Sequence, residues 1–482
     1  MKNSHDQELV NYMFLKSALT KDNIFNSTNE ILNWIKVKND EVHVDIQQIP
    51  FKKLVHWQFN EGNQKLVHNS GKFFSIDGLN IQVNVGRKSN WSQPIINQPE
   101  IGFLGIITKQ IDGILYFLLQ AKIEPGNVNY VQLSPTLQAT RSNYTQVHKG
   151  KKPMYLEYFT NFTNCELLLD QLQSEQGARF LKKRNRNIIL KVSDNIKVEN
   201  NFCWLTLGQI IELLNFDNIV NMDTRTVISG ISFGNYHAKD LDFHFLINDY
   251  LNNFNGKLIL SSIITNSSLF SLDQIIQWFT NLKTQYDVYI SNIPLRELSE
   301  WTIKEYSICH NENKYFEVIA VNVTIENREV SSWQQPIIKP LENGICAFVI
   351  KEIEGVLHFL VQAKFEPGNF DILEMAPTVQ CITGNYNNEE SKSELPYLDF
   401  VLTVCEKSIL FDSLQSEEGG RFYREQNRNL LIKAGNDFPI ETPPNYIWMT
   451  LNQIKMFIRF NNYINIQARS LLAAVSFKLE NQ

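Results

Sequence analysis

The chain carries one long sequence pattern twice. Residues 120–127 read QAKIEPGN, and residues 362–369 read QAKFEPGN. The offset, 362 − 120 = 242 residues, also separates Trp91 from Trp333. A chain of 482 residues is long for a single core. The repeat therefore predicts two domains, an N-terminal repeat with a leading helix over 1–240 and a C-terminal repeat with its connector over 241–482.

Helices are expected at the beginning and end of each copy. A hydroxyl residue followed three positions later by Glu or Gln satisfies the free N–H groups of a helix N-terminus. This capping box precedes apolar residues four times, at 27–30, 206–209, 271–274 and 450–453. Further helices are expected over 1–21, around 243–251, over 167–173 and over 411–415.

Strands are expected between these helices. Asp112-Gly113 separates two apolar runs, 103–107 and 114–119, and has the composition of a tight hairpin turn. Residues 187–192 and 429–433 have the pattern of further strands. Helices combined with mixed or antiparallel strands, present twice, predict an α+β fold.

The composition excludes several classes of protein. The chain is 43% hydrophobic and 20% charged, with a net charge of −6, which disfavours a broad nucleic-acid or anionic-membrane surface. The six cysteines are isolated, and neither they nor the histidines have zinc-ligand spacing. The N-terminus has no apolar leader, and no run is long enough to cross a membrane. We expect a soluble cytoplasmic protein.

Polar residues recur within the repeated pattern. Lys122 and Glu124 are two positions apart on an expected strand, so they should share a face, and Lys364 and Glu366 repeat them. They could form a solvated salt bridge, or the lysine could contact an anion while the glutamate orients it. The repeated tryptophans, each followed by Gln and Pro, could pack in a core or stack on a ligand.

Pairs of arginines also recur. Arg179 and Arg186 in the first copy correspond to Arg421 and Arg428 in the second. Two guanidinium groups are suited to a bidentate grip on a diphosphate. The alternative is charge pairing at helix ends. A cationic cluster present twice favours one type of ligand bound twice.

Differences between the copies are candidates for chemistry. Ser134, Arg141, Thr145 and His148 have no counterpart in the second copy. Near Tyr144, Arg141 and Lys151, His148 is a plausible acid/base group. Asp223 also differs, since the second copy has Gln467, although it could simply cap a helix. These differences favour chemistry near the first copy, unless the second has specialised instead.

Together these motifs resemble the NDP-hexose 2,3-dehydratases of deoxysugar biosynthesis. The resemblance rests on 91–96, 120–127, 132–151, 174–187, 204–209 and 221–225, and extends over nearly the whole chain. It implies tandem Nudix-like domains of mixed sheet flanked by helices, a homodimer, and a nucleotide sugar held in each half with one productive site. The Glu-rich box that binds magnesium in Nudix hydrolases is absent from 174–177 and 416–419, so no metal or other cofactor is expected.

The family's substrate implies a reaction. Members remove water across C2 and C3 of dTDP-4-keto-6-deoxyglucose, giving a 3,4-diketo sugar nucleotide. A separate NADPH-dependent 3-ketoreductase would consume that product. Two alternatives remain, a nucleotide-sugar pyrophosphohydrolase and a non-catalytic nucleotide-sugar binding protein.

The resemblance and the repeated motifs predict three groups of site residues. The catalytic candidates are His148 or Glu124 as base and Tyr144 or Lys122 as enolate donor or acid. The nucleotide-sugar candidates are Trp91, Gln120, Ser134, Thr136, Arg141, Asn143, Glu175, Arg179, Arg186, Asp223 and Arg225. The second-site candidates are Trp333, Gln362, Lys364, Glu366, Thr378, Asn385, Tyr386, Arg421 and Arg428.

Overall fold

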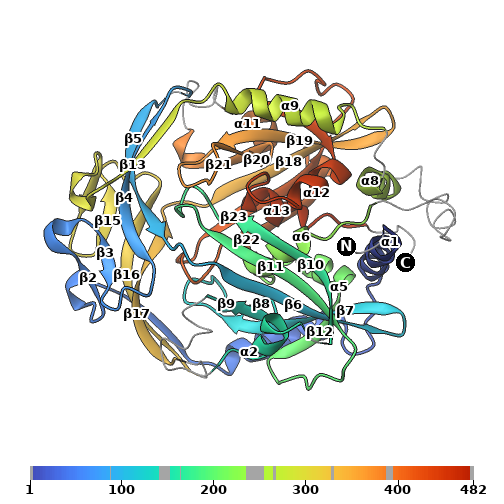
Figure 1. The fold of residues 1–482 in the computed structure, drawn as a ribbon, viewed down its shortest axis with the longest axis horizontal. Coiled ribbons are helices and arrows are strands. Elements are labelled where there is room, and N and C mark those ends of the chain that lie inside the picture. Colours follow the sequence, from blue (N-terminus) through green and yellow to red (C-terminus); the bar gives the residue numbers. More distant parts are fainter. Residues whose placement is uncertain are drawn as a thin grey trace.

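The protein has two similar halves that meet along their helices. The computed structural model describes residues 4–86, 88–140, 152–162, 164–234, 254–263, 267–326, 330–386 and 395–477. Two large sheets lie one above the other, and two smaller sheets lie side by side at one end of the molecule (Figure 1). Within the described residues, no helix is both long and apolar enough to cross a membrane.

The four predicted capping boxes are all present. They begin α2 (Thr28–Asp40), α5 (Leu207–Leu213), α9 (Leu272–Lys283) and α12 (Leu451–Ile458). The leading helix is also confirmed as α1 (Ser4–Leu19). The helix expected around 243–251 lies outside the described residues. Shorter helices are α4 (Leu156–Thr160), α6 (Met222–Ser229), α11 (Leu398–Thr403) and α13 (Ile466–Leu472).

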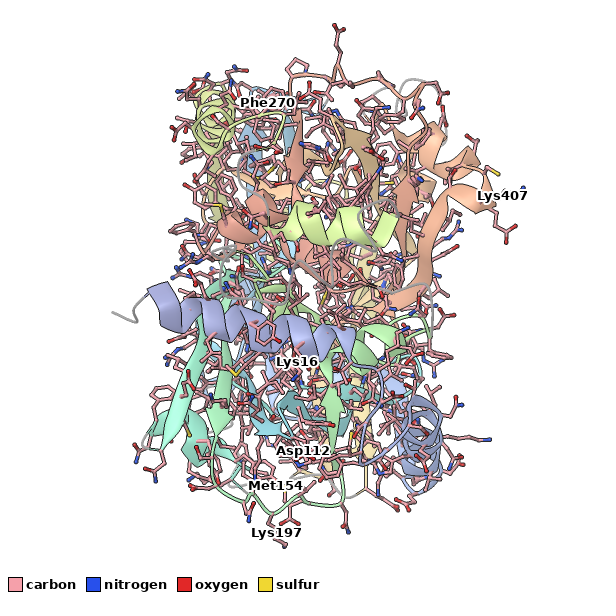
Figure 2. The ribbon with its side chains drawn as sticks, turned by 90° about the vertical axis from the view of Figure 1, so that its right-hand side faces the viewer. Lys16, Asp112, Met154, Lys197, Phe270 and Lys407 are labelled. Carbon is pink, nitrogen blue, oxygen red and sulfur yellow. The ribbon has the colours of Figure 1, made fainter. Side chains whose placement is uncertain are left out.

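Helix α8 (Phe254–Ile263) is the structural counterpart of α1. Ser17 Oγ donates to Leu115 O at 2.6 Å, and Ser261 Oγ makes the same bond to Leu357 O at 2.6 Å. Figure 2 shows the two helices lying across the face where the halves meet, with Lys16 on α1 above the hairpin turn at Asp112. Each half therefore begins with an equivalent helix.

Each half contains a seven-stranded mixed sheet, which confirms the α+β prediction. One strand pair in each sheet is parallel, β11 with β6 and β23 with β18, and the others are antiparallel. The first sheet contains β6 (Gly102–Ile111), β7 (Ile114–Ile123), β8 (Val131–Ser134), β9 (Leu137–Ala139), β10 (Cys165–Ser174), β11 (Arg184–Val192) and β12 (Phe202–Thr206). The second contains β18 (Gly344–Ile353), β19 (Val356–Phe365), β20 (Leu373–Ala376), β21 (Val379–Ile382), β22 (Ile409–Ser416), β23 (Gln426–Lys433) and β24 (Tyr446–Thr450).

The predicted hairpin joins β6 to β7. Its turn residues Asp112 and Gly113 have φ of 49° and 78°, and Glu354 and Gly355 repeat this with 51° and 83°. Positive φ at both positions matches the twist of the flanking strands.

The short helices predicted over 167–173 and 411–415 are wrong, because these residues belong to strands β10 and β22. The register of β10 against β11 shifts between Leu167 and Leu169, and that of β22 shifts between Ile409 and Phe411. A bulge of this kind breaks the alternation of inward and outward residues. The apolar spacing then resembles a helix, although pairing with the neighbouring strand determines the conformation.

The two small sheets exchange a strand between the halves. β1 (Val44–Ile49) of the first half pairs with β16 (Phe316–Ile325) of the second, and β13 (Val288–Ile293) pairs with β4 (Ser75–Val83) of the first. The remaining strands of these sheets are β2 (Trp57–Phe59), β3 (Leu66–His68), β5 (Asn90–Asn97), β14 (Trp301–Ile303), β15 (Ser307–His310) and β17 (Ser332–Pro340). A division of the chain at residue 240 stays a prediction, and it would separate β1 and β13 from their partner strands.

The cores are also shared between the halves. The largest cluster joins Phe117 of the first large sheet to Phe359 of the second through residues of α6 and α13. The small sheets share another, in which the rings of Phe180 and Phe422 lie 5.7 Å apart, edge to face. Apolar burial therefore stabilises the halves as one unit.

Two buried arginines link the halves with hydrogen bonds. Arg225 Nε donates to Ser470 Oγ at 2.8 Å, and its Nη1 donates to Gln415 Oε1 at 2.7 Å. Arg469 repeats this arrangement, with Nε donating to Thr226 Oγ1 at 3.0 Å and Nη2 to the carbonyl of Ser174. The charge of Arg469 also acts on two buried carboxyl groups, Glu374 and Glu175.

Replacing Arg469 with Ala should lower the free energy of unfolding by about 3–5 kcal/mol, because it leaves buried acceptors and carboxyls without their cation. Chemical denaturation of both proteins measures this. Arg186→Ala is the matched control, since Arg186 pairs with Asp170 at a half-exposed position and should change stability by about 0–1 kcal/mol. Equal losses in the two variants would contradict this view of the interface.

Candidate active site

The repeated motif forms a turn that docks on the opposite half. After β7, Gly126 N–H donates to Gly419 O at 2.7 Å, and Arg424 N–H donates to Gly126 O at 2.7 Å. Gly368 repeats both contacts with Gly177 and Lys182. A Cβ on Gly126 would lie 1.6 Å from Phe422 O, so only glycine allows this approach. The motif is present twice because each half docks on the other.

Lys122 and Glu124 lie side by side, as their spacing predicts. Lys122 Nζ is 3.9 Å from Glu124 Oε1. Gln138 Nε2 donates to the same carboxylate at 2.8 Å, and Ser134 Oγ donates to Gln138 Oε1 at 2.8 Å. This hydrogen-bond chain fixes the orientation of the Gln138 amide and therefore the position of Glu124.

The second half completes this group with Glu418 and Arg421. A Cβ built on Gly420 would lie 3.2 Å from Glu418 Oε1 and 3.5 Å from Glu124 Oε1. The two carboxylates, which come from different halves, thus approach the same point. Arg421 stacks over the Phe74 ring at 4.1 Å, and its Nε donates to Gln98 Oε1 at 3.1 Å. We call Lys122, Glu124, Gln138, Asp223, Glu418 and Arg421 the first junction.

Burial changes the acidity of the first junction. It raises the pKa of Asp223 well above its usual value, and the nearby charges of Glu418 and Glu124 act in the same direction. Burial also raises the pKa of Glu418, against the opposing charge of Arg421. Burial and the charge of Glu418 raise the pKa of Glu175 to about 7. Carboxyl groups in and beside the first junction therefore hold their protons to higher pH than solvated carboxyls do.

A second junction has related geometry but different chemistry. We define it by Lys364, Glu366, Gln380, Gln467, Gln176 and Arg179. Gln380 Nε2 donates to Glu366 Oε1 at 2.9 Å, and Asn465 Nδ2 donates to Gln380 Oε1 at 2.7 Å. Burial raises the pKa of Glu366, while the charges of Lys364 and Arg179 oppose the rise. Neutral Gln176 and Gln467 stand in the sequence where the first junction has Glu418 and Asp223.

The structure regroups several residues that the sequence assigned by copy. Arg179 acts on Glu366, and Trp91 lies 6.2 Å from the Phe365 ring, so both belong with the second junction. Trp333 packs in one cluster with Ile123, beside the first junction. The physical reason is that each small sheet and its loop cover the large sheet of the other half.

The tryptophans hold the docked loops through a relay. Trp91 Nε1 donates to Gln93 Oε1 at 3.1 Å, and Gln93 Nε2 donates to Ala178 O at 3.0 Å. In the second half Trp333 Nε1 donates to Gln335 Oε1 at 2.9 Å, and Gln335 Nε2 to Gly420 O at 2.8 Å. The repeated tryptophan motif, for which the sequence left core packing and ligand stacking open, therefore holds the loop of each junction in position.

Other predicted site residues have contacts within the fold. Arg186 binds Asp170 through two hydrogen bonds of 2.7 and 2.6 Å, and Arg428 binds Asp412 through bonds of 2.9 and 2.5 Å. The structure does not bring Arg186 together with Arg179 as a pair. Arg179 instead stacks over the Phe316 ring at 4.1 Å. Arg225 is buried between the halves, as described above.

The remaining predicted residues fall into three sets. Thr136 and Thr378 bridge strands, each accepting a backbone N–H at 2.9 Å, and Glu175 accepts from Asn185 Nδ2 at 2.7 Å. Gln120 lies on β7, Gln362 on β19, Asn385 in a 3-10 turn over Thr383–Asn385, and Tyr386 just after it. Residues outside the described ranges are Arg141, Asn143, Tyr144, Thr145, His148 and Lys151.

Sequence reasoning missed Glu418. The two loops read QSEQG and QSEEG, and this single difference was the available indication. A comparison that assigns each residue to the site of its own copy could not interpret this difference. Glu418 belongs to the second copy, yet it lies at the first junction. Lys183, whose charge opposes the raised pKa values of Glu175 and Glu418, was also missed.

A hollow in another part of the molecule is a weaker candidate. It has a volume of about 540 Å³ and lies between β4, β5 and β13, with Asn84, Asp287 and Tyr289 in its lining. Asp287 and Tyr289 are exposed side chains, so the hollow lacks the buried acids of the first junction. In the described part of the chain, no group of three or more His, Cys, Asp or Glu side chains could hold a metal ion.

Comparison with known proteins gives a consistent result. Residues 28–231 and 272–475 each match the family described as NDP-hexose 2,3-dehydratase. A protein of Saccharopolyspora spinosa named dTDP-4-dehydro-6-deoxy-alpha-D-glucopyranose 2,3-dehydratase is 44% identical over 468 residues, covering 96% of this chain and 94% of the relative. Proteins of the same name from Amycolatopsis orientalis and Streptomyces violaceoruber are each 40% identical, covering 95% and 92% of this chain and 92% and 95% of the relatives.

Buried Glu417 gives a pH-dependent prediction. Burial raises its pKa from 4.5 to about 8, so the folded protein holds this proton more tightly than the unfolded chain. The stability that the group contributes is present below about pH 4.5 and is lost as pH rises through 8. Glu417→Gln should therefore gain stability relative to the unmodified protein as pH rises from 5 to 8, measured as the difference in Tm. Glu157→Gln, at an exposed position, is the control, and a difference that stays constant with pH would contradict the prediction.

Proposed function

The chain belongs to the NDP-hexose 2,3-dehydratase family, and we propose that it removes water across C2 and C3 of dTDP-4-keto-6-deoxyglucose. The relatives are named for this activity, with the 4-keto group of the sugar written as 4-dehydro. Each match covers more than nine-tenths of this chain and of the relative. The observation that carries the proposal is the first junction, where buried carboxyls, a lysine and an arginine converge. Elimination needs this combination of a base, an acid and a positive charge.

The reaction begins at the carbon next to the ketone. The C4 carbonyl acidifies the C3 hydrogen, so a base can remove it and leave an enolate with its negative charge on O4. The electron pair then expels the C2 hydroxyl, which takes a proton and departs as water. The resulting enol tautomerises to the 3,4-diketo sugar. No hydride is transferred.

We assign the first two roles to the pair at the end of β7. Glu124 is the proposed base, because the Gln138 amide holds it beside Lys122. Lys122 is the proposed donor to O4, where its positive charge stabilises the enolate. His148 and Tyr144 remain alternatives for these roles and lie outside the described residues.

The nucleotide sugar needs contacts for its diphosphate, base and sugar. We propose Arg421 and Trp333 at the first junction and Arg179 and Trp91 at the second. Arg186 and Arg428, held by Asp170 and Asp412, are weaker candidates for the diphosphate. The proposed set around these contacts is Gln120, Ser134, Thr136, Arg141, Asn143, Glu175, Asp223 and Arg225 in the first half, and Gln362, Thr378, Asn385 and Tyr386 in the second.

The family resemblance supports broader proposals. Each half is proposed to have a Nudix-like fold, with the domains divided near residue 240. The protein is proposed to act as a cytoplasmic homodimer, together with a 3-ketoreductase that traps the diketo product. The enzyme is proposed to need no cofactor, because the elimination moves only protons and water.

The first test uses the substrate itself. Incubation of the purified protein with dTDP-4-keto-6-deoxyglucose, a 3-ketoreductase and NADPH should consume NADPH and give a 2-deoxy sugar nucleotide. Mass spectrometry should detect this product by the net loss of one oxygen atom, because water is lost and two hydrogens are then added. Release of dTMP and a sugar phosphate would support the pyrophosphohydrolase alternative. Unchanged substrate with a folded protein would overturn the proposed dehydration.

A second test compares the two junctions. Lys122→Met should lower kcat by about 10²–10³-fold, the usual loss when a group that stabilises an oxyanion is removed. Lys364→Met makes the same change at the second junction and should lower kcat less, because that junction lacks Asp223 and Glu418. Circular dichroism of both variants verifies folding, and a larger loss at Lys364 would assign the reaction to the second junction.

A further inference from the structure

We propose that Glu418, carried by the second half, is a catalytic residue of the first junction and protonates the leaving C2 hydroxyl. The proposal rests on the dehydration described above. It implies that one productive site is built from both halves, with its base from one and its acid from the other.

The geometry places Glu418 opposite Glu124. Their Oε1 atoms lie 3.2 and 3.5 Å from the point where a Cβ on Gly420 would be. The corresponding residue in the other loop is Ala178, so the first junction has a glycine where both carboxylates approach. Glu418 and Gly420 are partly accessible, whereas Glu417 and Gly419 on either side are buried. Glu418 is therefore more accessible than its neighbour Glu417.

The surroundings of Glu418 favour its protonated form. Burial and the charge of Glu124 raise the pKa of Glu418, while Arg421, Lys183 and Lys122 oppose the rise. Asp223 and Glu175 face the same group, and burial and the charge of Glu418 raise the pKa of each. Gln138 donates a hydrogen bond to Glu124 and holds its carboxyl group in place. Two carboxyl groups that approach one point from different halves are suited to acid and base roles.

The second junction lacks this arrangement. Gln176 takes the sequence position of Glu418, is buried, and donates its amide N–H to Glu417. An amide cannot supply a proton to a leaving hydroxyl. Another carboxyl, Glu374, lies near Glu366 of the second junction, but it accepts from Ser174 Oγ at 2.9 Å and lies near Arg469 in the contact between halves.

The proposed step balances in protons and electrons. Glu124 takes the C3 proton, and the C–H electron pair becomes the enolate. The C2–O bond breaks as Glu418 gives its proton to the leaving hydroxyl, which departs as water. The enol then loses its O3 proton and gains one at C2. The proton held by Glu124 restores Glu418, either directly or through water.

The test is Glu418→Gln, which keeps the shape and removes the acid. Turnover in the coupled assay should fall by about 10²–10⁴-fold, while dTDP binding measured by calorimetry stays within a few-fold. Glu417→Gln is the control, because it makes the same change one residue away in the contact between halves, and it should keep turnover within a few-fold. Glu418→Asp keeps the acid group and should retain part of the activity. This variant tests the role of Glu418 if the Gln variant does not fold.

The outcomes separate this proposal from the dehydration itself. An unmodified protein with no trapped product overturns the dehydration. An active unmodified protein whose Glu418→Gln variant keeps its kcat overturns only the role of Glu418. Equal loss of turnover in Glu418→Gln and Glu417→Gln also overturns it, since that result indicates a structural effect of either change.

Discussion

The structure depends on how closely the turn after each long hairpin approaches the loop of the opposite half. Gly126 and Gly368 exchange backbone hydrogen bonds with that loop at 2.7 Å, and neither position has room for a side chain. Each contact fixes the position of one loop. The loop that contacts Gly126 carries Glu418 and Arg421, and the loop that contacts Gly368 carries Gln176 and Arg179. The shared cores and the buried arginines Arg225 and Arg469 then hold the halves in that relation. A small steric constraint thus determines which side chains meet.

The same burial that holds the halves together produces the acidity of the first junction. Carboxyl groups taken out of water resist ionisation, and several placed near one another resist it further. Lys122, Lys183 and Arg421 offset part of this cost without removing it. The result is a group whose members differ in their readiness to hold a proton, which a uniform solvated surface would not provide. Stability and chemistry therefore draw on the same interface.

Much of the fold could be predicted from the sequence because it depends on local patterns. The capping boxes, the Asp112-Gly113 turn and the pairing of Lys122 with Glu124 all follow from residue types at fixed spacing. The strands at 165–174 and 409–416 could not be predicted, because a bulge disturbs their alternation and only the neighbouring strand defines them. The exchange of β1 and β13 has no local pattern at all. For that reason the candidate site was grouped by copy, and Glu418 was missed while Glu124 was found.

The strand exchange has a consequence for how such a chain can change over evolutionary time. A single copy of the repeat could complete its small sheet in the same way by taking β1 or β13 from another molecule, as in a domain-swapped symmetric dimer. In that dimer both junctions would be identical, and every substitution would appear at both. Joining the copies in one chain removes this restriction, so Glu418 can face one junction while Gln176 faces the other. Fusion thus allows one interface to specialise while its twin keeps the architecture.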